Sequence, residues 1–175
     1  MKTVSIFCSS YNNIDKQYFS DAEEIAKLLV EYDCKIIIGG GANGLMGKIA
    51  DVATALHGNI EGIRHEELMQ NSDEPFHHKI KIREEVKGIE QRKRIMYDEA
   101  DIILVLPGGA GTLEELFYSI TCNRLLNKEK PIIIFNKSGL FDPLSILTKQ
   151  LVEQGFQTKD YCFTFVRIED LVRFL

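Results

Sequence analysis

Residues 101–115 read DIILVLPGGAGTLEE and combine three features in a fixed order. The run from Asp101 to Leu106 is the most apolar in the chain, which predicts a strand buried on both faces. Three glycines follow within residues 108–111, and a helical pattern begins at Thr112. A buried strand that leads through a glycine-rich loop into a helix is typical of α/β proteins that bind ligands at the carboxyl ends of their strands.

The same alternation of apolar strands and helical stripes extends along the chain in both directions. We expect strands at residues 4–8, 35–38, 59–63, 79–82, 101–106, 131–135 and 161–166. We expect helices at residues 16–32, 45–56, 86–100, 112–126 and 143–153, with a last helical turn or two at 169–175. The polar residues 64–78 receive no element. This alternation predicts one domain, residues 1–175, with an α/β fold of the Rossmann-like, doubly wound class, in which helices cover both faces of a mainly parallel sheet.

Composition and charge exclude several classes of protein. A length of 175 residues, with 45% hydrophobic and 27% charged, suits one globular domain that buries its own core. The formal net charge of -5 argues against a general nucleic-acid binder, which usually presents a basic face. No apolar run approaches the ~20 residues of a membrane helix. The cysteines form no C-x-x-C pair, so we expect reduced thiols and a cytoplasmic protein; they are Cys8, Cys34, Cys122 and Cys162.

A further glycine-rich loop follows the strand expected at 35–38. Residues 39–44 read GGGANG and satisfy the G-x-G-x-x-G pattern, between an expected strand and an expected helix. Glu61 lies about 20 residues further on, near the place of the acid that binds a ribose in dinucleotide-binding folds. Three interpretations stay open here: contact with a nucleotide or phosphate, tight packing of the loop without a ligand, and binding of NAD.

The loop at residues 107–112 has the composition of a phosphate cradle. Gly108, Gly109 and Gly111 let the backbone approach a ligand closely. The free amides of the next helix then point at the ligand, the helix dipole favours an anion, and Thr112 adds a hydroxyl. The alternative is a capping box, in which Thr112 and Glu115 satisfy amides of the first helical turn. A capping box explains these two residues but not the glycines.

The helix expected at 86–100 carries two cations on its apolar stripe. Arg92 and Lys93 fall on the same face as Ile89, Met96 and Ala100. A cation on a core-facing stripe needs a partner, which would be an anionic ligand, a carboxylate or both. The alternative is that both side chains extend from the edge of the stripe into solvent.

The helix expected at 112–126 has a second face that is half apolar. Glu115 lies roughly opposite the core face of this helix, beside Tyr118, Ser119 and Cys122. A half-apolar second face indicates that another surface packs there. We therefore expect a dimer contact near Glu115.

Three stretches together resemble the signature blocks of a known family. They are residues 39–47 (GGGANGLMG), 91–93 (QRK) and 107–115 (PGGAGTLEE). In this order they are similar to the Lonely Guy family, the cytokinin-riboside 5′-monophosphate phosphoribohydrolases, and the similarity covers roughly residues 3–155. Many relatives have carried the label lysine decarboxylase, but no lysine here is shown in a position to hold pyridoxal phosphate. We set that label aside.

The resemblance implies a Rossmann-like homodimer whose active sites lie near the subunit interface. The implied catalytic pair is Arg92 and Glu115. The residues implied to hold a 5′-phosphate are Lys93, Gly108, Gly109, Gly111 and Thr112. The residues implied to line the same pocket are Gly40, Gly41, Gly44 and Met46.

The chain departs from the family pattern at three places. Residues 89–90 (IE) stand where Met-His usually precedes the Arg-Lys pair, and residues 8–10 (CSS) stand where Cys-Gly-Ser usually ends the first strand. Residues 63–64 (IR) stand where a proline is common. The catalytic pair and the phosphate loop are intact, so the departures concern the pocket around the base and the choice between prenylated adenine and plain AMP.

The implied reaction is hydrolysis of the N-glycosidic bond of a nucleoside 5′-monophosphate, which yields a free base and ribose 5-phosphate. Departure of the base builds positive charge on the ribose. Glu115 would stabilise that charge, hold a ribose hydroxyl or act as a base toward water, while Arg92 would orient Glu115 and the sugar. We expect no cofactor and no metal, and as partners the substrate and a second copy of the chain.

Three alternatives to this function stay open. The first is a broader nucleosidase for AMP and related 5′-monophosphates, which uses the same chemistry. The second is a non-catalytic carrier of a nucleotide or cofactor, for which loss of Arg92 or Glu115 would be expected. The third is an NAD-dependent oxidoreductase, which would use the G-x-G-x-x-G loop and Glu61.

Overall fold

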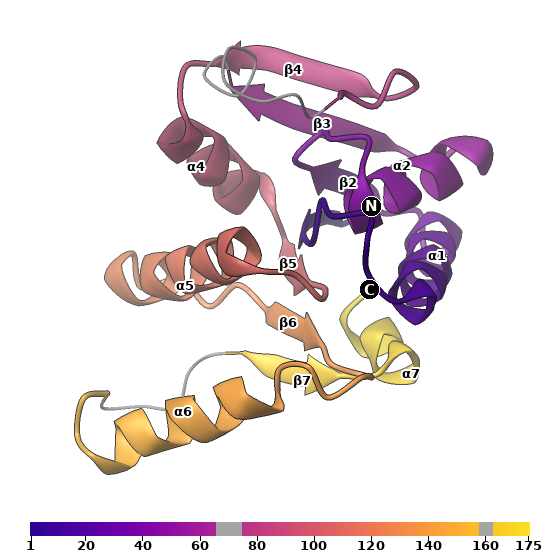
Figure 1. Cartoon of the computed structure of the whole chain (residues 1–175). Helices are drawn as coiled ribbons and strands as arrows, with labels where there is room; N and C mark the ends of the chain where they lie inside the picture. The colour runs from indigo at the N-terminus through magenta and orange to yellow at the C-terminus, as the bar shows by residue number, and fades with distance from the viewer. Residues whose placement is uncertain (66–74, 158–162) are drawn as a thin grey trace.

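The computed structural model describes residues 1–65, 75–157 and 163–175 (Figure 1). At its centre is a seven-stranded sheet in the order β4-β3-β2-β1-β5-β6-β7, and each neighbouring pair of strands is parallel. The strands are β1 (Thr3–Phe7), β2 (Lys35–Ile38), β3 (Ile60–His65), β4 (Lys81–Val86), β5 (Ile102–Val105), β6 (Ile132–Phe135) and β7 (Thr164–Val166). The helices are α1 (Lys16–Glu31), α2 (Gly44–Ala55), α4 (Ile89–Glu99), α5 (Ala110–Leu125), α6 (Asp142–Glu153), α7 (Ile168–Leu171) and the 3-10 turn η1 (Val172–Phe174).

Helices cover both faces of the sheet, which confirms the predicted doubly wound class (Figure 1). Successive side chains of a strand point to opposite faces, so neighbouring isoleucines of β2 enter different cores. Ile36 and Ile38 pack in the cluster that includes Ile25 of α1. Ile37 packs in the opposite cluster, with Met96 of α4. The apolar strand runs of the sequence therefore reflect burial from two sides.

The boundary between β4 and α4 differs from the sequence prediction. β4 continues to Val86, where a helix was expected to begin, because Val86 is buried and pairs with His65 of β3. α4 begins at Ile89, since Gly88 before it is extended, with φ -156 and ψ 171. Most of the unassigned segment 64–78 and the first residues of the strand expected at 161–166 lie outside the described residues.

α6 packs against the rest of the molecule less than the other long helices (Figure 1). Thr148 is its buried residue, whereas Ile146 is 61% exposed and Leu147 is 48% exposed. Across residues 1–65, 75–157 and 163–175, none of the helices has the length and apolar character that a membrane span requires.

The strand order reverses between β1 and β5, which places a crevice at their carboxyl ends. From β1 the chain continues to α1 on one face of the sheet, and from β5 it continues to α5 on the other. The two loops stay joined beyond the strands, because the Ser9 amide donates to the Pro107 carbonyl at 3.1 Å. In doubly wound folds ligands bind at such a reversal point.

Candidate active site

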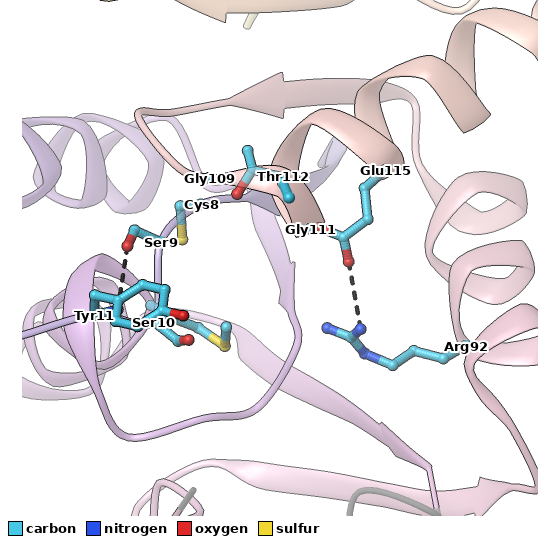
Figure 2. A pocket seen from close by; sticks show the side chains of 11 residues that line it. Cys8, Ser9, Ser10, Tyr11, Arg92, Gly109, Gly111, Thr112 and Glu115 are labelled. Carbon is cyan, nitrogen blue, oxygen red and sulfur yellow. Dashed lines mark hydrogen bonds and ion pairs between the residues drawn. The ribbon is translucent and has the colours of Figure 1, made fainter.

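A pocket of about 320 Å³ lies at this reversal point (Figure 2). Four segments line it: the loop after β1, the start of α2, the middle of α4 and the start of α5. Its lining residues are Cys8, Ser9, Ser10, Tyr11, Met46, Arg92, Gly109, Ala110, Gly111, Thr112 and Glu115. The volume falls in the range of pockets that hold small molecules.

Arg92 and Glu115 face one another across the pocket from α4 and α5 (Figure 2). Arg92 Nη1 lies 3.3 Å from Glu115 Oε1, and Arg92 Nε donates to the Ile63 carbonyl of β3 at 3.0 Å. The side chains are 11% and 13% exposed. The partners of this cation are thus a carboxylate and a backbone carbonyl. The alternative interpretation, in which the side chain extends into solvent, is wrong for Arg92.

The environment of Glu115 changes its acidity. Burial raises the pKa of the Glu115 carboxyl above its ordinary value, while the Arg92 guanidinium opposes that shift. The result is a carboxylate that accepts a proton more readily than one in water. A raised pKa on a group that lines a pocket is typical of a catalytic base.

The first turn of α5 presents backbone amides to the same pocket. Gly109 is the N-cap and makes no side-chain capping bond; the helical bonds begin with the Leu113 amide, which donates to the Gly109 carbonyl at 3.0 Å. The amides of residues 110–112 therefore precede the hydrogen-bond ladder of the helix. An added Cβ at Gly109 or Gly111 would meet no heavy atom within 4 Å, so both glycines border open space.

The capping-box interpretation of Thr112 and Glu115 is wrong. α5 begins at Ala110, so Thr112 lies inside the first turn instead of at its cap, and the Glu115 carboxylate is directed to Arg92. Thr112 packs its hydroxyl over Gly108, where any Cβ would overlap it. Gly108 itself does not line this pocket but borders a neighbouring hollow.

Lys93 does not reach the pocket. Its Nζ donates to Glu114 Oε1 at 2.5 Å and lies 2.9 Å from Glu90 Oε1, above the ring of Tyr118. Burial lowers the pKa of the Lys93 ammonium, but the bonds to Glu114 and Glu90 outweigh burial, so the pKa lies above its ordinary value. The lysine expected at a phosphate is therefore held by two carboxylates, and Lys93 is 4% exposed, so extension into solvent is wrong for it too.

Of the residues expected from the first glycine loop, the structure brings Met46 to the pocket. Gly40, Gly41 and Gly44 are absent from its lining. Gly44 has φ +60, and an added Cβ there would lie 2.5 Å from the Ser9 carbonyl oxygen. The packing interpretation holds for Gly44, which lets the loop approach the segment after β1, and for Gly40, where an added Cβ would lie 3.0 Å from the Ile82 side chain and 3.5 Å from Gly62 Cα.

Gly39 serves the site indirectly. An added Cβ at Gly39 would overlap Nη2 of Arg92, so the absence of a side chain leaves room for the guanidinium. The start of the same loop therefore leaves room for the Arg92–Glu115 pair.

Comparison with known proteins shows the family of this chain. A family model described as "Possible lysine decarboxylase" matches residues 46–174. The "Probable cytokinin riboside 5'-monophosphate phosphoribohydrolase LOG6" of Arabidopsis thaliana is 34% identical over 155 residues, which cover 89% of this chain and 76% of that protein. The chain belongs to the Lonely Guy family. A "Cytokinin riboside 5'-monophosphate phosphoribohydrolase" of Rhodococcoides fascians is also similar, at 29% identity over 90% of this chain and 79% of its own length.

Solved structures share the fold of this Lonely Guy protein. The molybdenum cofactor binding protein from Rippkaea orientalis superposes with a TM-score of 0.69 at 17% identity, over 98% of this chain and 93% of its own. The molybdenum cofactor carrier protein from Chlamydomonas reinhardtii superposes with a TM-score of 0.70 at 13% identity, over 99% and 97% of the two chains. At these identities the likeness shows the fold alone.

The NAD-binding interpretation of Glu61 does not fit this member of the family. The Glu61 carboxylate lies 2.7 Å from Lys35 Nζ and accepts from Arg83 Nη2 at 2.8 Å, within β3. The carboxylate that would have bound a ribose is therefore paired with two cationic side chains. The lining of the pocket contains no lysine for pyridoxal phosphate, and no metal-binding cluster of His, Cys, Asp or Glu occurs among the described residues.

Sequence reasoning treated the segment after β1 as a departure from the Lonely Guy pattern that concerns the pocket around the base, and it named none of these residues as a site residue. The structure places Cys8, Ser9, Ser10 and Tyr11 in the pocket lining. The fold class could have predicted this position, because in a doubly wound fold the first strand lies at the reversal point. Its following loop must then border the ligand crevice.

Proposed function

We propose that the protein hydrolyses the N-glycosidic bond of an adenine nucleoside 5′-monophosphate and releases the free base and ribose 5-phosphate. One observation carries the proposal: the buried Arg92–Glu115 pair and the uncapped first turn of α5 line a single pocket. The names of the curated relatives support the same class of reaction.

The start of α5 is proposed to bind the 5′-phosphate. The amides of residues 110–112 and the positive end of the helix dipole favour a dianion there. Gly109 and Gly111 allow the phosphate oxygens to approach the backbone. The binding energy from this end of the substrate then holds C1′ of the ribose beside Glu115, which lies one turn further along the helix.

The bond that breaks joins C1′ of the ribose to a ring nitrogen of the base. As it lengthens, positive charge develops on the ribose, and the Glu115 carboxylate stabilises that charge or removes a proton from the attacking water. The water oxygen bonds to C1′, and the base leaves with a proton. Arg92 holds the carboxylate in place because its Nε is fixed on the Ile63 carbonyl.

The second proposed feature is a homodimer whose interface lies near the active site. Apolar side chains remain exposed at the end of α5 and on α6, including Leu125 at 74% and Ile146 at 61%. Ser119 and Cys122, expected in the contact, are already buried within the subunit, so the contact is proposed to centre on α6 and the end of α5. Size-exclusion chromatography with light scattering tests this: a monomer would refute it.

A cytoplasmic location is proposed from the thiols. Cys34 and Cys122 are buried and form no disulfide, which suits a reducing compartment. Cys162 lies outside the described residues. Fractionation of the source cells tests the location.

The deciding experiment measures base released from AMP, isopentenyladenosine monophosphate, GMP and CMP by the purified protein. We expect release from the adenine nucleotides, and a loss of at least ~100-fold in Arg92→Ala. Arg94→Ala is the matched control, because Arg94 lies on the exposed face of α4 and pairs with Asp98. Absence of release with a folded protein would refute the proposal and favour a nucleotide carrier.

A further inference from the structure

A second hollow of about 430 Å³ adjoins the pocket at the reversal point. It lies beyond the start of α5, between the beginning of α1 and the loop after β6. Its lining residues are Ser9, Tyr11, Asn13, Ile14, Tyr18, Pro107, Gly108, Gly109 and Leu140. Three of these residues, Ser9, Tyr11 and Gly109, also line the first pocket, so the two hollows adjoin at them.

The position of the hollow relative to the catalytic pair decides what can enter it. The proposed substrate extends from a phosphate at the start of α5 toward C1′ beside Glu115, so its base lies beyond Glu115. The hollow lies in the other direction, because its lining contains Pro107, Gly108 and Gly109 but neither Arg92 nor Glu115. Figure 2 shows Tyr11 and Ser9 on the side of the pocket opposite to the Arg92–Glu115 pair.

The chemistry of the hollow differs from that of the phosphate cradle. Two tyrosine rings and the apolar side chains of Ile14 and Leu140 line it, and no lysine or arginine is among its lining residues. Tyr18 is packed against the core and gives a fixed wall, whereas Tyr11 is 72% exposed at the divide. Such a lining fits an apolar ring and does not fit a further phosphate.

We propose that the protein takes nucleoside 5′-phosphodiesters whose second ester group is an apolar ring, and that this ring occupies the hollow between Tyr11, Tyr18 and Leu140. The inference rests on the proposed function, since the phosphate must lie over the start of α5. In folds of this class one ligand commonly crosses the reversal point, with its phosphate at the helix start. The hydrolysis itself is unchanged: water adds at C1′, the base leaves with a proton, and the phosphodiester stays intact.

The test compares three ligands by calorimetry and by base release: AMP, its methyl phosphoester and its phenyl phosphoester. The methyl ester is the control for the charge lost on esterification. Burial of the ring beside the tyrosines is expected to give the phenyl ester about tenfold lower Kd than the methyl ester. Equal Kd values for the two esters, with AMP bound and hydrolysed, would overturn this inference and leave the proposed function standing.

Two variants locate the effect. Leu140→Asp places a carboxylate in the hollow on a side chain that is 47% exposed, and Tyr18→Leu removes a ring while keeping an apolar group. Each is expected to abolish the preference for the phenyl ester and to leave the Kd of AMP within about twofold. A preference that survives both variants would overturn the placement of the ring. If AMP itself neither binds nor reacts, the proposed function fails first, and the inference fails with it.

Discussion

Replacement of Glu115 by glutamine separates catalysis from folding at this site. Glu115→Gln keeps the size of the side chain and removes its charge. If the carboxylate stabilises the ribose cation or accepts the proton of water, kcat is expected to fall by ~10²–10⁴. Thermal stability is expected to hold or to rise slightly, because burial already disfavours the charged form of this carboxyl and raises its pKa.

The dependence on pH gives a second, independent check of the same variant. A group whose pKa is raised by folding contributes stability below its unfolded pKa, and that contribution is lost as the pH rises through the folded pKa. Activity has the opposite sign, since it needs the carboxylate and falls as the pH drops through the raised pKa of Glu115. As the pH is lowered, kcat of the parent protein should therefore begin to fall at a higher pH than it would if Glu115 had the ordinary pKa of a glutamate.

The assay pairs base release with urea unfolding of both proteins over a pH series that starts near the ordinary pKa of a glutamate, about 4, and extends above it. The difference in unfolding free energy between parent and variant isolates Glu115 from the other carboxyl groups. Retention of kcat within tenfold would refute the catalytic role. A loss of several kcal/mol in the variant would instead mean that the Arg92–Glu115 pair is structural.

Three further predictions concern residues other than Arg92 and Glu115. Lys130 Nζ donates to three carbonyl oxygens at the end of α4, at 2.6 to 2.8 Å. Lys130→Met should therefore lower the free energy of unfolding in urea by ~2 kcal/mol. An unchanged unfolding midpoint would contradict this capping role. Gly108→Ala should raise KM for AMP, because the added methyl would overlap Thr112 and displace the start of α5; steady-state kinetics decide it. Lys27 and Lys48 lower the pKa of the Glu23 carboxyl to about 2, so Lys48→Met should raise that pKa in an NMR titration.

The layers of the fold could be predicted because strands buried on two faces leave continuous apolar runs in the sequence. The edge strand β4 was shortened in the prediction, since it pairs on one side and carries charges such as Lys81 and Arg83 among its apolar residues. Its junction with α4 depends on the extended backbone of Gly88, and the spacing of apolar residues does not predict that conformation.

The candidate site could be predicted where the residue type does not suit the element in which it occurs. A cation on an apolar stripe pointed to Arg92, and the glycines of residues 107–112 pointed to the open start of α5. Lys93 shows the limit of that reasoning. It is also a cation on the apolar stripe, but it pairs with Glu90 and Glu114 and does not line the pocket. The choice between ligand and carboxylate depends on tertiary contacts that spacing does not encode.

The fixed points of this site are largely main-chain atoms. Arg92 is held by the carbonyl of Ile63, and the proposed phosphate contacts are amides of residues 110–112. Substitution of the side chain at residue 63 leaves its carbonyl in place, and substitution at residue 110 leaves its amide. Many mutations can therefore accumulate around the pocket without disturbing these contacts, provided that the backbone keeps its path. A site built this way can diversify in what it admits while it retains the geometry of the reaction.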